Sequence, residues 1–228
     1  MIHRKLMIAA ALVLLGGSAA MANKAALTGD TQHGAVGTTP CGGCHTPHAG
    51  LNGNSLLWVK SVGTSTYTVY TSASLKNTSS NITSPGNGLL VAGTPSNNTL
   101  LCMSCHDGAL AATNSVTLTT TNYGTVGAAL STSALLDVGA GGNLGNDHPV
   151  NLAHNPTLNT TLAAVAAVTG AGLQLYTGGT ATNFVECGTC HNPHQGPTGV
   201  TNTPKSLSLG YYLRVANNTS QLCTTCHL

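Results

Sequence analysis

The stretch Cys41-Gly-Gly-Cys44-His45 has three counterparts further along the chain: Cys102-Met-Ser-Cys105-His106, Cys187-Gly-Thr-Cys190-His191 and Cys223-Thr-Thr-Cys226-His227. These four segments contain all eight cysteines. Cys-x-x-Cys-His is the attachment signature of c-type haem. Two thiols at this spacing can form thioethers with the two vinyl groups of one porphyrin, and the next histidine can bind the iron from the proximal side. The pattern therefore predicts four haem c groups, with the eight cysteines as thioether donors and, as proximal iron ligands, His45, His106, His191 and His227.

Other cysteine chemistries explain the pattern less well. A disulfide framework would suit a secreted chain, and two Cys-x-x-Cys pairs could form a Cys₄ zinc site. Neither of these requires a histidine after every second cysteine. A thioredoxin-like redox motif would need a neighbouring βαβ pattern, which the sequence does not contain.

The first 22 residues have the features of a secretory signal peptide. A short basic start is followed by an apolar segment from Leu6 to Leu15 and by the cleavage pattern Ala20-Met21-Ala22. The alternative is a single transmembrane anchor, for which this apolar segment is too short. We therefore expect cleavage after Ala22 and a secreted chain of residues 23–228 at the cell surface or outside the cell, with a periplasmic location as the alternative.

Five further histidines compete for the distal side of the four irons: His33, His48, His148, His154 and His194. The only methionine outside the signal peptide, Met103, lies inside its own attachment segment, so distal methionine ligation is excluded. We therefore predict bis-histidine ligation at all four irons, with His154 as the spare histidine. The alternative is that His154 is a ligand and His33 only caps the N-terminus. The predicted distal ligands are His33, His48, His148 and His194.

Two of these histidines are expected to connect haems. His48 lies three residues after His45, and His194 lies three residues after His191. Residues so close in sequence cannot easily bind the two opposite faces of one macrocycle, because each axial nitrogen lies about 2 Å from the metal. His48 and His194 are therefore predicted to bind the iron of a different haem from that of their own segment. The alternative is that both are surface histidines near a haem.

The composition excludes several classes of partner. Only 5% of the residues are charged, against about 25% in typical soluble domains, and loss of Arg4 and Lys5 with the signal peptide leaves five basic and five acidic side chains. Basic patches for nucleic acid and polybasic membrane anchors are absent from the sequence. With one Phe, one Trp and six Tyr, an apolar core is expected to be thin. We expect the haems to replace it, packed against Trp58, Tyr70, Phe184, Tyr211 and Tyr212.

The expected fold class is a multihaem cytochrome c, mostly irregular, with short helices and a few short strands wrapped around a chain of four haems. Residues 41–50 and 187–196 have similar sequences, which indicates two haem-pair units, at about 33–110 and 145–228, within one domain. Alternating patterns predict short strands at 67–70 and 116–120, and an Ala/Val-rich segment predicts a short helix at 162–168. Helical turns are expected around each attachment segment.

At this level the sequence resembles a known family. The ordered motifs CGGCHTPH, SLLW, LCMSCHDG, NDHPV, VECGTCHNPH and LCTTCH are similar to those of doubled-CxxCH multihaem cytochromes and extend over most of 33–228. Within that group the chain resembles extracellular tetrahaem cytochromes of the OmcE type, which polymerise into conductive filaments. The resemblance implies bis-histidine haems throughout, head-to-tail assembly, and one haem completed by a histidine of the neighbouring protomer, for which His33 is a candidate.

The expected function is extracellular electron transfer through four haem c groups in a filament, without enzymatic activity. Redox partner proteins or extracellular acceptors would exchange electrons with it. The alternatives are a non-polymerising electron shuttle and, less favoured, a multihaem oxidoreductase, which would need an open iron.

Overall fold

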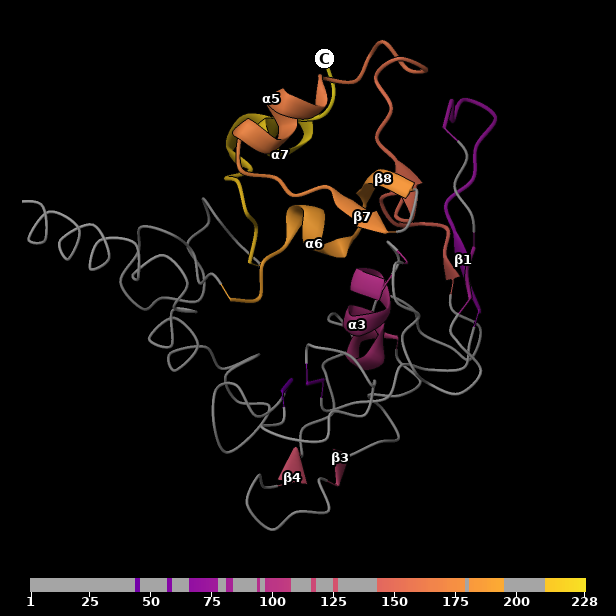
Figure 1. Ribbon diagram of the computed structural model, residues 1–228, viewed down its shortest axis with the longest axis vertical. Coiled ribbons are helices and arrows are strands. Elements are labelled where there is room, and N and C mark those ends of the chain that lie inside the picture. The colour runs from indigo at the N-terminus through magenta and orange to yellow at the C-terminus, as the bar shows by residue number, and fades with distance from the viewer. Residues whose placement is uncertain are drawn as a thin grey trace, which may run out of the picture.

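The computed structural model describes residues 44–45, 57–58, 66–77, 81–83, 94, 97–107, 116–117, 125–126, 143–178, 181–194 and 212–228 (Figure 1). Within these ranges the secondary structure consists of short strands and short helices joined by irregular segments. The predicted signal peptide and the predicted site residues His33, Cys41 and His48 lie outside the described ranges, as does Tyr211. None of the helices in the described part of the chain has the length and apolar character needed to cross a membrane.

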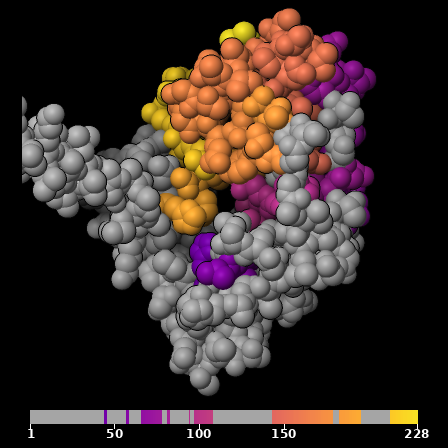
Figure 2. All heavy atoms as spheres, in the orientation of Figure 1, coloured from indigo at the N-terminus to yellow at the C-terminus, as the bar shows by residue number. Residues whose placement is uncertain are grey.

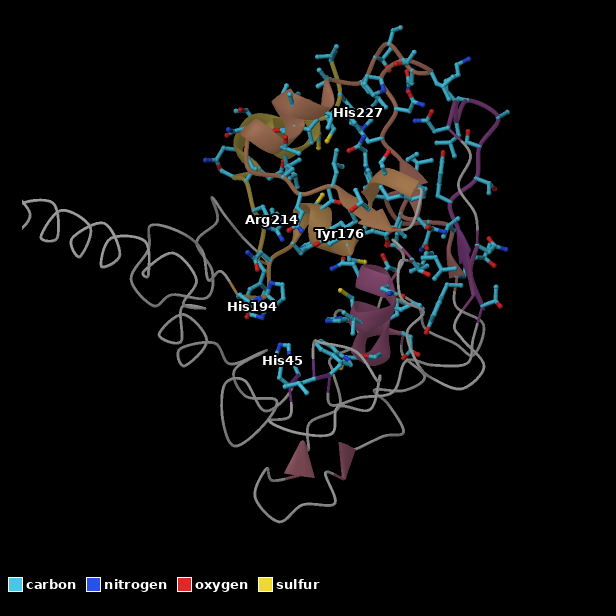
Figure 3. The ribbon with its side chains drawn as sticks, viewed as in Figure 1. His45, Tyr176, His194, Arg214 and His227 are labelled. Atoms are coloured by element: carbon cyan, nitrogen blue, oxygen red, sulfur yellow. The ribbon has the colours of Figure 1, made fainter. Side chains whose placement is uncertain are left out.

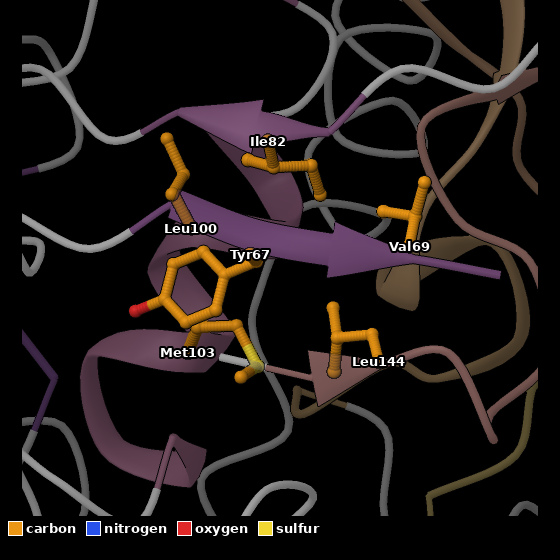
Figure 4. Close-up of a cluster of buried hydrophobic side chains, with 6 residues drawn as sticks. All are labelled: Tyr67, Val69, Ile82, Leu100, Met103 and Leu144. Carbon is orange, nitrogen blue, oxygen red and sulfur yellow. The ribbon is translucent and has the colours of Figure 1, made fainter. Parts of the chain in front are cut away.

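A three-stranded sheet and one helix form the first apolar cluster. Strand β1 (Thr66–Val69) pairs antiparallel with β2 (Ile82–Thr83) and parallel with β5 (Asn143–Leu144). Alternate side chains of β1 face inward, against helix α3 (Asn97–His106). Figure 4 shows the resulting cluster of six buried side chains, which are Tyr67, Val69, Ile82, Leu100, Met103 and Leu144.

Met103 is fully buried in this first cluster. Its thioether therefore packs in the protein interior, within the cluster that β1 and α3 form. Tyr67 is also almost fully buried, and its hydroxyl donates to Asp107 over 3.3 Å. Tyr67 was not among the aromatic residues expected to pack against a haem. In the structure it is a residue of the apolar core.

A second sheet leads directly into the third attachment segment. Its strands are β6 (Leu152–Ala153), β8 (Ala181–Val185) and β7 (Tyr176–Gly178), in the order β6-β8-β7 and all antiparallel. Helix α6 (Cys187–Cys190) begins two residues after β8. A separate two-stranded ladder pairs β3 (Val116–Thr117) with β4 (Thr125–Val126).

The C-terminal segment packs against helix α5 (Val165–Gly170). Here a one-turn 3-10 helix, Asn218–Ser220, runs into α7 (Gln221–Thr224), and Figure 1 shows α5 and α7 side by side. The second apolar cluster lies at this junction and consists of Ala163, Val168, Leu173 and Val215. On the face shown in Figure 2, the segments from 143 onward form one continuous mass beside α3.

The predicted elements occur with shifted boundaries. The strand predicted at 67–70 corresponds to β1, and the one predicted at 116–120 overlaps β3, while residues 118–120 lie outside the described ranges. The helix predicted at 162–168 begins instead at Val165, because Ala164 has extended backbone angles and Leu162 pairs with His227. Helical turns occur at the second, third and fourth attachment segments.

Candidate functional site

Helical geometry explains how each described cysteine pair is presented. Side chains three residues apart lie on the same face of a helix. Cys102 and Cys105 occupy the last turns of α3, and Cys187 and Cys190 are the first and last residues of α6. None of the seven cysteines within the described ranges forms a disulfide bond. The two thiols of α3 and the two thiols of α6 therefore each lie at neighbouring points of one helix face.

Backbone pairing holds three of the four attachment histidines. Isolated antiparallel bridges join His45 to Trp58, His191 to Leu213, and His227 to Leu162. Neighbouring hydrogen bonds extend two of these bridges. The Arg214 N–H donates to the Cys190 carbonyl over 2.7 Å, and the Leu228 N–H donates to the Thr161 carbonyl over 2.9 Å. His106 differs because it is the last residue of α3.

Two of these histidines lie opposite an imidazole from a distant segment. The ring centres of His45 and His194 are 6.0 Å apart, and those of His148 and His227 are 6.4 Å apart. Figure 3 shows His45 and His194 next to each other, with His227 at the other end of the described site. His148 and His194, both predicted distal ligands, thus each lie beside a predicted proximal ligand of another segment.

These separations fit an ion held between two rings. An imidazole nitrogen binds a metal at about 2.0–2.1 Å, so two rings on opposite sides of one ion have their centres roughly 6.3 Å apart. The observed 6.0 and 6.4 Å lie on either side of this value. The distances between ring centres are therefore compatible with a metal ion bound between the two rings of each pair.

The protonation of His148 and His194 suits metal binding. Partial desolvation of the rings lowers the pKa of both, and His227 and His45, respectively, lower it further. His148 Nδ1 lies 3.0 Å from the Pro149 carbonyl oxygen. When Nδ1–H donates to this oxygen, the Nε2 lone pair is left for a metal, which is the usual arrangement of a ligating histidine.

His154, the histidine predicted to be spare, is engaged elsewhere. Its side chain is buried, and Nε2 lies 2.8 Å from the Ala163 carbonyl oxygen. The Ala163 N–H in turn donates to the Cys226 carbonyl over 2.9 Å. Ala163 thus contacts both His154 and the fourth attachment segment.

The second and third attachment segments are in direct contact. The Cys102 and Cys187 thiols hydrogen-bond to each other, which raises the pKa of Cys102, as does burial, and lowers that of Cys187. Two residues of α3 also receive hydrogen bonds from the start of α6. The Gly188 N–H donates to Asn98 Oδ1 over 2.6 Å, and the Cys187 N–H donates to Thr99 Oγ1 over 3.4 Å.

The other attachment segments adjoin this central contact. The Cys44 thiol is close enough to contribute to the raised pKa of Cys102. Burial raises the pKa of Cys190 to about 11, and Cys226 of the fourth segment contributes next. A thiol with this pKa is protonated at neutral pH, so Cys190 is not poised as a nucleophile. The first segment thus has a cysteine near the second, and the fourth has one near the third.

Three side chains lie at the contacts between these segments, and two of them, Glu186 and Arg214, were absent from the sequence predictions. The third is Trp58, whose indole Nε1–H donates to Ser104 Oγ over 3.1 Å and whose ring meets His45 edge-on at 5.5 Å. Its packing against a haem stays a prediction. Glu186 is 1% exposed and caps α6, and Thr99 Oγ1 donates to its Oε2. Arg214 Nε–H donates to the Gly188 carbonyl over 2.7 Å. Glu186 could have been singled out from the sequence, because charged residues are rare in it and this one directly precedes an attachment segment.

Among the residues that the structure describes, no three His, Cys, Asp or Glu side chains converge as a metal-binding cluster.

A comparison with protein-family models found no match to the chain. A comparison with curated proteins likewise found none.

Proposed function

We propose that this protein transfers electrons through four covalently attached haem c groups, each held by two histidines. The observation that supports this best is the pairing of attachment histidines with imidazoles from distant segments, at 6.0 Å for His45 and His194 and 6.4 Å for His148 and His227. An iron with histidine on both sides has no open position for a substrate. The proposed role is therefore electron transfer, without an enzymatic reaction.

The chain's own residues have three tasks in this proposal. The cysteine pairs attach the cofactors, the histidine pairs close both axial positions, and the hydrogen bonds between α3 and α6 set the spacing of neighbouring sites. When bound, the haems supply the redox chemistry, since their irons alternate between the ferric and ferrous states.

The same chain is proposed to assemble head to tail into an extracellular filament. A heterologous interface that does not close on itself produces an open filament. Near-zero net charge lowers the repulsion between copies. The resemblance of the ordered motifs to filament-forming tetrahaem cytochromes supports this part of the proposal. A soluble electron shuttle with the same ligands is the alternative.

Three kinds of measurement test the proposal. The mass and haem content of the secreted protein should correspond to four haems per chain, and the reduced protein should not bind CO. A lower haem content, or CO binding by the unmodified protein, would contradict four closed sites. Electron microscopy of material secreted under native conditions should show filaments, and dispersed monomers alone would favour the shuttle.

A further inference from the structure

We infer that the two described histidine pairs hold their irons with different ring orientations, so that the two irons are spectroscopically distinct. This inference rests on the proposed function. The planes of His45 and His194 differ by 22°, whereas those of His148 and His227 differ by 67°. One iron would therefore have nearly parallel axial rings and the other would have crossed rings.

The contacts of the four rings restrain these orientations. The ring of His45 meets Trp58 at 88°, and its backbone is bridged to the same residue. The His194 N–H donates to Asn192 Oδ1 over 3.0 Å, which holds the turn that carries this ring. His148 is restrained by the contact of Nδ1 with the Pro149 carbonyl and by the extended backbone that a following proline favours. The backbone of His227 is bridged to Leu162.

Ring orientation determines the electronic structure of a ferric low-spin iron. Its unpaired electron occupies a pair of d orbitals that overlap with the π orbitals of the axial rings. Parallel rings interact with one orbital of the pair and split the two in energy, which produces a rhombic EPR signal. Crossed rings interact with both orbitals alike and leave them nearly equal, which produces a strongly anisotropic signal with a large maximal g value. Axial ligation is thus the feature by which this chain would differentiate its irons.

EPR of the oxidised, fully haem-loaded protein tests the inference. The unmodified protein should contain both signal types. His194→Ala should remove a rhombic component, and His148→Ala should remove a large-g component. In each variant one iron should become high-spin when oxidised and bind CO when reduced, and added imidazole should restore the low-spin state. The matched control is His154→Gln, which should keep both signals because His154 Nε2 is bonded to the Ala163 carbonyl.

The outcomes separate this inference from the proposed function. Absence of either signal type from the unmodified protein would overturn it, and this measurement requires no variant to fold. It would also be overturned if the two variants removed the opposite components. A chain without haem would refute the proposed function itself, which haem content reports independently.

Discussion

The indole of Trp58 donates a hydrogen bond of 3.1 Å to the hydroxyl of Ser104, which lies between the two cysteines of the second attachment segment. The same indole meets the imidazole of His45 edge-on. Ser104 is buried, and its hydroxyl donates onward to the Leu101 carbonyl over 2.7 Å. One side chain thus connects His45, the predicted proximal ligand of the first segment, to the helix that carries the second.

Trp58→Phe should destabilise the protein by at least about 0.5–1.5 kcal/mol, because it keeps an aromatic ring beside His45 but removes the hydrogen bond to Ser104 and part of the packing surface of the indole. Denaturant unfolding of the haem-loaded protein would measure the loss. Ser104→Ala removes the partner of the same bond, so the double variant should cost less than the sum of the two single variants. Strict additivity would show that the bond contributes nothing.

A second prediction concerns Gly188, at the contact of α6 with α3. A Cβ on Gly188 would overlap the Tyr176 hydroxyl and approach the Asn98 amide to 2.7 Å. Asn98 cannot move away freely, because it accepts the Gly188 N–H. Gly188→Ala should therefore cost about 1–3 kcal/mol of unfolding free energy, as overpacked sites do.

Gly170 provides the matched control for Gly188. It lies in α5, and nothing approaches a Cβ at that position within 4 Å. Gly170→Ala should stabilise the protein by roughly 0.5–1 kcal/mol, since Gly is a poor helix former. Equal effects at the two positions, measured by the same unfolding assay, would contradict the tight approach of α3 to α6.

Local patterns predicted the attachment segments, and long-range contacts decided the remainder. The Cys-x-x-Cys-His spacing is visible in the sequence because, in the proposed function, both thiols and the histidine must reach one macrocycle. The start of α5 could not be predicted in the same way, because Leu162 pairs with His227, which is remote in sequence. Spacing suggested that His194 serves a haem other than its own. Only the folded chain places its ring beside His45, and the ligation itself stays a prediction.

Glu186 is expected to make stability depend on pH. It is the only glutamate in the sequence, and burial raises its pKa to about 7 although the Thr99 hydroxyl donates to it. In the unfolded chain the pKa should be about 4.3, so between these values the folded state holds a proton that the unfolded state has lost. The contribution of Glu186 to stability is therefore lost as pH rises from about 4.3 to 7, by up to roughly 1.4 kcal/mol per pH unit.

Glu186→Gln should remove this dependence. The difference in unfolding free energy between the variant and the unmodified protein should increasingly favour the variant as the pH rises through this window. Above the folded pKa the difference should become constant, because the carboxyl group is then ionised in both states. Both proteins contain the same histidines, so histidine titration cancels in the difference between their unfolding free energies. A difference that does not change with pH would show that Glu186 ionises normally.

Arg214 fastens the third attachment segment through its guanidinium. Nε–H donates to the Gly188 carbonyl over 2.7 Å, and Nη2–H donates to Gln174 Oε1 over 2.8 Å. Arg214→Lys keeps the charge but loses the planar fork, and Arg214→Gln loses both. Each substitution should cost about 1.5–3 kcal/mol in denaturant unfolding, the usual range for hydrogen bonds to a charged group.

Redox titration distinguishes the effect of the Arg214 hydrogen bonds from the effect of its positive charge. If the proposed electron-transfer function holds, a nearby positive charge favours the reduced iron, so Arg214→Gln should lower the potential of one haem while Arg214→Lys leaves it nearly unchanged. A potential that falls equally in both variants would assign the effect to the lost hydrogen bonds, because only they are missing from both. Unchanged stability in Arg214→Lys would instead show that the fork to Gly188 and Gln174 does not hold the segment.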